Sequence, residues 1–112
     1  PRSTLFPYTT LFRSTILETM DLIINTTSLG MTGGPDPKKS PIDTSLLNTR
    51  ALCYDLVYSP QITPFLREAK NNKIDTIGGL SMLVFQAASG FELLTNKNAP
   101  INTMLDSVGI KL

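Results

Sequence analysis

Histidine and tryptophan are absent from the sequence, and cysteine occurs once, as Cys53. The lone cysteine excludes a disulfide within the chain, and without histidine the usual zinc-binding sets of Cys and His cannot be assembled. Apolar runs are short as well, far below the roughly 20 residues that a membrane-spanning helix needs. These absences favour a soluble protein of a reducing compartment, and we expect a cytoplasmic location with no metal ion.

An excess of charge of one sign is also lacking. Ten Lys and Arg residues stand against nine Asp and Glu residues, which gives a formal net charge of +1. Without Arg2 and Arg13, which belong to the segment discussed next, eight basic and nine acidic residues remain and the formal charge is −1. Because clustered positive charge is what binds the phosphates of nucleic acids, this balance argues against a nucleic-acid partner.

The first fourteen residues, Pro1–Ser14, do not have the pattern of a helix, a strand or a secretory signal. Pro7 to Thr10 interrupt the only apolar residues of this segment, whereas a signal peptide needs an unbroken apolar stretch. The segment resembles the translation of a short-read sequencing adapter at every position. We therefore expect residues 1–14 to be non-native, and residues 15–112 to be a fragment of a larger protein.

Three short apolar runs have the composition of strands buried on both faces of a parallel sheet, namely Asp21–Asn25, Ala51–Val57 and Asp75–Ile77. Between the first two strands the sequence predicts a loop over residues 30–41 and a helical turn capped by Asp43 or Thr44. Between the second and third strands it predicts a helix capped by Thr63, with Pro64 in its first position. After the third strand it predicts a long helix from about Leu80 and a last helix over residues 101–108. This alternation of strands and helices predicts an α/β fold with three parallel strands.

The long helix carries two apolar stripes. Residues at helical spacing predict a core-facing stripe of Leu80, Leu83, Val84, Ala87, Ala88, Phe91 and Leu94. A second stripe combines Met82 and Leu93 with the amide of Gln86. A helix that is apolar on two sides is expected to pack between two bodies, so the amide on the second stripe marks Gln86 as a candidate site residue.

Each predicted strand ends in polar or glycine residues: Asn25 to Ser28, Asp55 with Tyr58, and Gly78 with Gly79. In parallel sheets ligands bind beyond the carboxyl ends of the strands, so three such ends on one rim indicate a binding site. Turn formation alone would also place polar residues and glycine there. Periodicity does not decide between these two interpretations.

Three ordered blocks carry a resemblance to a known family: INTTSLGM at residues 24–31, YDLVYSPQITPFL at 54–66 and GGLSMLVFQAASGFELLT at 78–95. They are similar to the N-A-T-x-x-G-M, Y-D-x-x-Y-x-P-x-x-T-P-x-L and D-G-x-x-M-L-x-x-Q-A-x-x-x-F-x-x-W-T patterns of shikimate dehydrogenases. The resemblance implies the C-terminal half of a Rossmann-like NADP-binding domain, followed by helices that pack toward a separate substrate domain. Members of the family reduce 3-dehydroshikimate to shikimate by hydride transfer, a step of aromatic amino acid biosynthesis.

For the cofactor side, the resemblance implies that Leu56 lies against the nicotinamide end of NADP and that the backbone of Gly79 approaches the same ring. Asn25 and Thr27 match a strand-end motif that borders the cofactor. Without the family, Leu56 would be interpreted as a core residue of its strand, and the other three as turn residues.

For the substrate side, the resemblance implies that the hydroxyl of Tyr58 approaches shikimate and that Gln86 hydrogen-bonds a substrate hydroxyl. Taken alone, Tyr58 would be a surface aromatic, and Gln86 a half-buried amide satisfied by a backbone group. Asp55 is expected to tie down the end of its strand, and Cys53 to be a small buried apolar residue.

The chain lacks other parts of the family's machinery, which lie upstream in family members: the glycine-rich phosphate loop, the basic motif for the 2′-phosphate and the catalytic Lys–Asp pair. We therefore expect no catalytic residue in this chain and no activity from it alone. Gly78 and Ser81 stand where the family often has Asp and Gly, which leaves shikimate or quinate open as the substrate.

Two other hypotheses stay open. The intact enzyme could be a quinate/shikimate dehydrogenase that uses NAD or NADP, or the chain could be a non-catalytic α/β interaction module. A small-molecule substrate is the expected partner, without nucleic acid or membrane, and a homodimer is left open for the intact enzyme.

Overall fold

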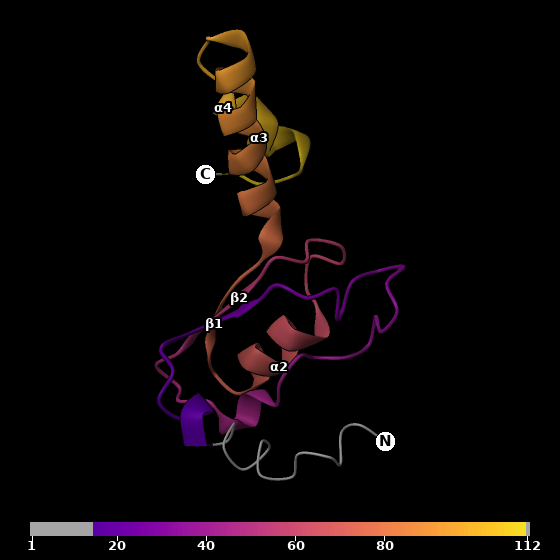
Figure 1. Cartoon of the computed structure of the whole chain (residues 1–112), viewed down its shortest axis with the longest axis vertical. Coiled ribbons are helices and arrows are strands. Elements are labelled where there is room, and N and C mark those ends of the chain that lie inside the picture. The colour runs from indigo at the N-terminus through magenta and orange to yellow at the C-terminus, as the bar shows by residue number, and fades with distance from the viewer. Residues whose placement is uncertain (1–14, 112) are drawn as a thin grey trace.

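A computed structural model describes residues 15–111. The predicted non-native segment Pro1–Ser14 lies outside the described residues. The elements are, in chain order, β1 (Leu22–Asn25), the 3-10 turn η2 (Thr44–Leu46), β2 (Leu52–Asp55), α2 (Pro64–Asn71), β3 (Asp75–Ile77), α3 (Gly79–Thr95) and α4 (Ile101–Ser107) (Figure 1). Every strand and helix predicted from the sequence is present, in the predicted order.

The three strands form one parallel sheet in the order β1-β2-β3. Ile23 of β1 and Thr76 of β3 both pair in register with Cys53 of the central strand. Because the strands are parallel, their carboxyl ends lie at the same edge of the sheet. The predicted α/β fold with three parallel strands is confirmed.

Helix α2 covers one face of this sheet. It begins as its sequence predicts, since Thr63 is the N-cap, accepts a hydrogen bond from the Leu66 N–H and precedes Pro64 in the first turn. Seven buried residues from β2, α2 and the connecting segments form the core on this face: Leu47, Ala51, Cys53, Phe65, Leu66, Ala69 and Ile74.

The opposite face of the sheet is open. Leu22 and Ile24 of β1 are 49% and 48% exposed, and Ile77 of β3 is 38% exposed. Register places Ile24 and Ile77 on the same face, since both pair with Tyr54. The prediction that the first strand is buried on both faces is therefore wrong for this chain, because the part of the chain that the structure describes supplies a covering helix for one face only.

Strand β2 ends at Asp55, two residues earlier than predicted. The Leu56 N–H still continues the ladder by donating to the Asn25 carbonyl over 3.1 Å. The Val57 N–H instead donates to Oδ1 of Asp55 over 2.9 Å. Short polar side chains of this kind compete with the ladder for backbone groups, so the aspartate terminates its own strand.

Helices α3 and α4 form a hairpin that rises from the carboxyl edge of the sheet (Figure 1). Val84, Ala88 and Leu105 are buried between the two helices, apart from the core under α2. Leu94, predicted to face the core, is 89% exposed, and Ala87 is exposed as well. Of the predicted core-facing stripe, only Val84 and Ala88 are buried, so the prediction is confirmed for these two positions and wrong for Ala87 and Leu94.

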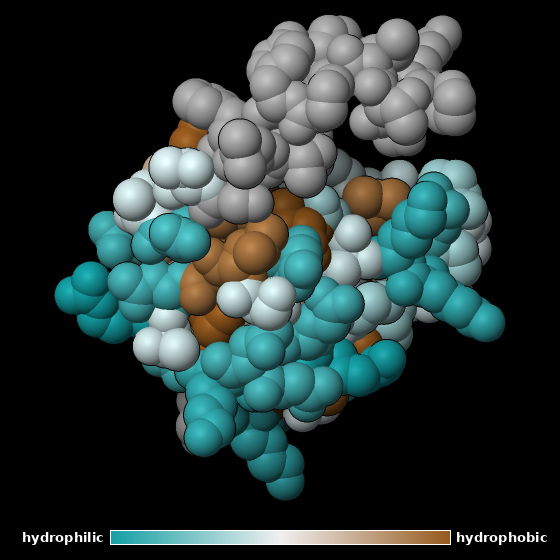
Figure 2. Space-filling view, turned by 90° about the horizontal axis from the view of Figure 1, so that it is seen from below, coloured by the Kyte–Doolittle hydropathy of each residue, from teal (hydrophilic) through white to brown (hydrophobic). Residues whose placement is uncertain are grey.

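The end of the molecule opposite this hairpin is mostly hydrophilic, with a few apolar areas between the polar side chains (Figure 2). Within residues 15–111, no helix has both the length and the apolar character needed to cross a membrane. The same residues contain no group of three or more Cys, Asp or Glu side chains placed to hold a metal ion.

Candidate functional site

A pocket of about 450 Å³ opens at the carboxyl edge of the sheet, between the segments that follow β1 and β2. Its lining residues are Thr26, Thr27, Ser28, Met31, Thr32, Leu56, Val57, Tyr58 and Ser59. The two segments are tied together by a 2.8 Å hydrogen bond from the Thr32 N–H to the Ser59 carbonyl. Three predicted site residues, Thr27, Leu56 and Tyr58, therefore lie around one pocket although they are up to 31 residues apart in sequence.

Asn25 lies behind the pocket wall and is only 2% exposed. Its Oδ1 accepts hydrogen bonds from the Thr27 N–H over 3.0 Å and from the Thr27 hydroxyl over 2.6 Å. The same threonine hydroxyl accepts a bond from the Leu29 N–H. Asn25 thus orients Thr27 and the turn that follows β1, whereas a direct contact of Asn25 with a ligand stays a prediction.

Asp55 is the partner of Asn25 on the neighbouring strand and is fully buried. Its Oδ1 accepts hydrogen bonds from Nδ2 of Asn25 over 3.0 Å and from the Val57 N–H, while its Oδ2 accepts a 2.6 Å bond from the Thr63 hydroxyl. A buried carboxylate needs several donors of this kind to offset its lost hydration. The expectation that Asp55 ties down the end of its strand is confirmed.

Gly79 is buried at the start of α3, directly against the end of β2. A β-carbon at this position would collide with the Leu56 carbonyl oxygen and would lie 2.7 Å from the Leu56 carbonyl carbon and 2.9 Å from the Asp55 carbonyl oxygen. Only glycine permits this approach of α3 to the pocket wall. The contact gives Gly79 a packing role beside the nicotinamide contact that the resemblance implies.

The two residues predicted to hold substrate lie apart. Tyr58 is 47% exposed at the mouth of the pocket, where a hydroxyl can reach a ligand. Gln86 is exposed on α3, two turns beyond Gly79, and is not among the residues that line this pocket. The residues described here bring Tyr58 to the pocket at the sheet edge and leave Gln86 on a separate surface.

Sequence reasoning did not nominate several lining residues, of which Met31, Thr32 and Ser59 are examples. Met31 and Ser59 lie within the family blocks but carry no predicted role, and Thr32 lies in the predicted loop. The signal available was their position directly after the ends of neighbouring parallel strands, where loops meet over the sheet edge.

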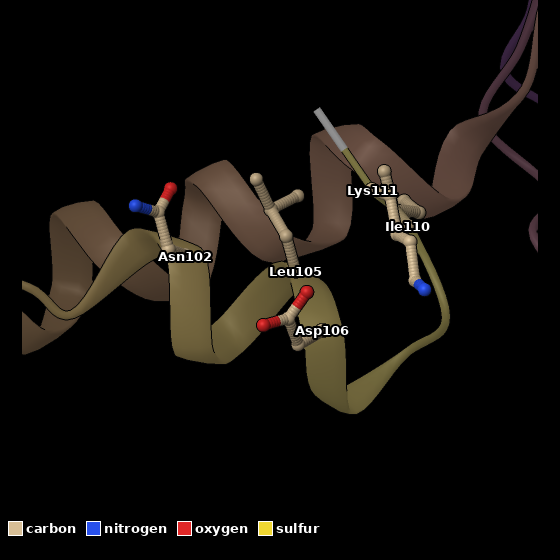
Figure 3. Close-up of a pocket in the computed structure, with 5 residues that line it drawn as sticks. All are labelled: Asn102, Leu105, Asp106, Ile110 and Lys111. Atoms are coloured by element: carbon tan, nitrogen blue, oxygen red, sulfur yellow. The ribbon is translucent and has the colours of Figure 1, made fainter.

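A second hollow, of about 370 Å³, lies along α4 and the segment beyond it (Figure 3). Asn102, Leu105 and Asp106 of α4 and Ile110 and Lys111 beyond it line this hollow. Its lining includes none of the predicted site residues. The pocket at the sheet edge is therefore the better candidate for the functional site.

A parallel sheet with a helix on its face and a pocket between the loops at its carboxyl edge is the arrangement of nucleotide-binding α/β proteins. The nine residues that line this pocket carry hydroxyl groups and apolar side chains but no charged group. The pocket therefore suits an uncharged, ring-shaped part of a ligand better than its phosphates.

Residues 79–108 match the family model described as the shikimate 5'-dehydrogenase C-terminal domain. The shikimate dehydrogenase (NADP(+)) of Methanococcus aeolicus is 44% identical over 88 residues, which are 79% of this chain and 31% of that protein. The solved structure of shikimate 5-dehydrogenase from Thermus thermophilus, in complex with NADP(H) and shikimate, superimposes with a TM-score of 0.72 at 34% identity, covering 81% of this chain and 34% of that one. Quinate dehydrogenase from Corynebacterium glutamicum, in complex with NAD, superimposes with a TM-score of 0.75 at 26% identity, covering 86% and 33%.

Sequence and fold agree, since both match the C-terminal region of shikimate dehydrogenases. The chain spans about a third of the length of the curated relatives that it matches.

Proposed function

We propose that this chain forms the nicotinamide-proximal part of an NADP-dependent shikimate dehydrogenase. The full-length enzyme would catalyse the reversible reduction of 3-dehydroshikimate to shikimate, in the biosynthesis of aromatic amino acids. The observation that carries the proposal is the pocket that Thr27, Leu56 and Tyr58 share, in a chain whose relatives are named shikimate dehydrogenase (NADP(+)).

The pocket fits the ring end of a nicotinamide dinucleotide. Leu56, Val57 and Met31 offer apolar surface for a flat ring, while the hydroxyl groups of Thr27 and Ser59 offer partners for a carboxamide or a ribose. No Lys or Arg lines the pocket, so the phosphates and the 2′-phosphate would be held by other parts of the full-length protein. The nicotinamide ring, when bound, supplies or accepts the hydride.

On the substrate side, we propose that Tyr58 and Gln86 position shikimate. The exposed hydroxyl of Tyr58 stands at the pocket mouth, next to the place proposed for the ring. Gln86 would approach the substrate from the exposed face of α3, and its amide could donate to and accept from a hydroxyl group. Hydride transfer depends on the relative placement of ring and substrate, so these residues would contribute by orientation rather than by proton transfer.

A quinate/shikimate dehydrogenase that also uses NAD is a second candidate. It is favoured by the similarity of the whole fold to quinate dehydrogenase in complex with NAD, at the same level as to the NADP-bound shikimate enzyme. The pocket described here does not discriminate between the two cofactors, since they differ at the 2′-phosphate, far from the ring.

The test is a steady-state assay of the full-length protein whose sequence contains residues 15–112. Shikimate and quinate are each offered with NADP and with NAD, and formation of the reduced cofactor is followed by absorbance. Higher kcat/KM for shikimate with NADP than for the other three pairs supports the leading proposal. A preference for quinate or NAD supports the second candidate, and absence of turnover with all four pairs overturns both.

The 112-residue chain alone is proposed to be inactive, since its pocket lining contains no Asp, Glu or Lys to move a proton. NADPH-dependent reduction of 3-dehydroshikimate by the purified chain would contradict this.

We also propose a cytoplasmic location, to which the buried free thiol of Cys53 is suited. Size-exclusion chromatography of the full-length protein would decide whether it is a homodimer.

A further inference from the structure

The two walls of the pocket share one buried anchor. Asp55 receives hydrogen bonds from three elements: from Asn25 at the end of β1, from the Val57 N–H in the pocket wall and from Thr63 at the cap of α2. Asp55 and Thr63 have no exposed surface, and Asn25 has almost none. These three side chains are called the Asn25–Asp55–Thr63 network below.

Each end of the network acts on a pocket-lining segment. Asn25 holds Thr27 through its Oδ1 and Asp55 through its Nδ2, so one amide joins the loop after β1 to the end of β2. Asp55 fixes the backbone at Val57, the residue between Leu56 and Tyr58. The described residues contain no buried side-chain polar atom without a partner, so the network is fully satisfied.

We propose that Asp55 is a positioning residue of the site: it sets the relative placement of the two pocket walls without touching the ligand. This inference rests on the proposed function, since it assumes that the pocket holds the nicotinamide end. Thr63 supports Asp55 in the same role. The Thr63 hydroxyl donates to the Asp55 carboxylate and accepts from the Leu66 N–H. The same oxygen atom therefore links the first turn of α2 to the residue that holds the pocket wall.

A positioning role predicts a particular split in kinetic constants. The pocket carries no charged residue and so contributes little to binding of the phosphates. Loss of Asp55 should therefore lower kcat, which depends on ring orientation, more than it raises the KM for NADP. An Asn at position 55 keeps one acceptor for Asn25 and Val57 and can turn its amide group to the Thr63 hydroxyl, so it should restore most of the loss.

The experiment uses the full-length protein with Asp55→Ala, Asp55→Asn and the control Ile74→Val, which trims a core residue under α2 that is 3% exposed and outside the network. At a temperature well below every Tm, kcat for Asp55→Ala should fall at least about tenfold, and the KM for NADP should change less than about threefold. Asp55→Asn should recover most of kcat, and Ile74→Val should lower Tm with wild-type kcat.

A second readout is independent of activity. Amide hydrogen exchange at Val57 should accelerate at least about tenfold in Asp55→Ala. Exchange at Arg67, whose N–H donates to Thr63 within α2, should stay at the wild-type rate. Should Asp55→Ala not fold, Thr63→Val replaces it, with Thr63→Ser as its rescue and the same kinetic split expected.

Wild-type kcat and wild-type Val57 exchange in Asp55→Ala would overturn the positioning role, as would wild-type kcat in Thr63→Val where that variant takes its place. So would a loss of kcat that Ile74→Val reproduces at equal loss of Tm. If the wild-type protein reduces no 3-dehydroshikimate, the proposed function fails instead, and exchange at Val57 still decides whether Asp55 holds the pocket wall.

Discussion

Gly79 packs against Leu56 so closely that a β-carbon at position 79 would lie 2.7 Å from the Leu56 carbonyl carbon. The three nearest atoms, which are the Leu56 carbonyl oxygen and carbon and the Asp55 carbonyl oxygen, are all backbone, so none can yield by a rotamer change. The start of α3 is thereby set against the wall of the pocket, and the requirement for glycine arises from a contact between residues 23 positions apart.

We expect Gly79→Ala to destabilise the protein by about 1–3 kcal/mol, because the new methyl group forces α3 away from the end of β2. The matched control is Gly90→Ala, since Gly90 lies in the same helix and a β-carbon there meets nothing within 4 Å. That control should raise stability by about 0.4–1 kcal/mol. Urea unfolding of both variants measures the difference, and equal effects of the two substitutions would contradict the close contact.

The hairpin of α3 and α4 should open independently of the sheet. Its buried residues, among them Leu105 at 2% exposure, do not belong to the core under α2. Leu105→Ala should therefore remove about 2–5 kcal/mol from the hairpin, with little effect on the sheet. Hydrogen exchange would show faster exchange in α4 with unchanged protection of β2, and uniform acceleration through both would show a single cooperative unit.

Stability at alkaline pH should depend on Cys53. Burial raises the pKa of this thiol from 9.0 to about 11, because the thiolate would be desolvated in the core. The folded-state pKa lies above the unfolded value, so the contribution to stability is fully present below about pH 9 and is lost as the pH rises through about 11.

Urea midpoints measured from pH 8 to 11.5 should fall more steeply for the wild type than for Cys53→Ala, which lacks the titrating group. Parallel curves for the two proteins would show that the thiol does not couple to folding. At pH 8 the folded thiol should also react with a disulfide reagent more slowly than the unfolded one, because it is buried and its raised pKa lowers the thiolate fraction.

The open sheet face should make the 112-residue chain associate with itself. Leu22, Ile24 and Ile77 expose apolar side chains there, and β1 is an edge strand. We expect light scattering to report oligomers at high concentration and Ile24→Lys to reduce them. Thr103→Lys, which adds the same charge at an exposed position of α4, should leave the oligomers unchanged. A wild-type chain that stays monomeric would contradict the prediction.

In the full-length protein, Gln86→Ala should weaken shikimate binding by about 1–3 kcal/mol, because a substrate hydroxyl loses its partner, and should leave NADP binding unchanged. Ser89→Ala, at an exposed position one turn further along α3, is the control. KM values for both ligands provide the measurement. A raised KM for NADP with an unchanged KM for shikimate would place Gln86 on the cofactor side.

Short-range signals in the sequence were sufficient for the element types and their order. Thr63 followed by Pro64 fixed the start of α2, because an N-cap and its first turn are adjacent in the chain. Asp43 likewise caps η2 as anticipated, and its hydrogen bonds from the Ser45 hydroxyl and Ser45 N–H lower the pKa of the carboxyl group. The family blocks located the rim residues, and the structure brings Thr27, Leu56 and Tyr58 to one pocket.

Only the tertiary structure decides which residues far apart in the chain lie together and which side chains are buried. Strand register places Asn25 opposite Asp55, so a side chain that the sequence marks as a cofactor neighbour becomes a buried link between two pocket walls. Leu94 has the spacing of a core residue, yet it is 89% exposed. Periodicity specifies which side of a helix or strand is apolar, whereas burial depends on which other segment packs there, and that is set by contacts between segments far apart in the chain.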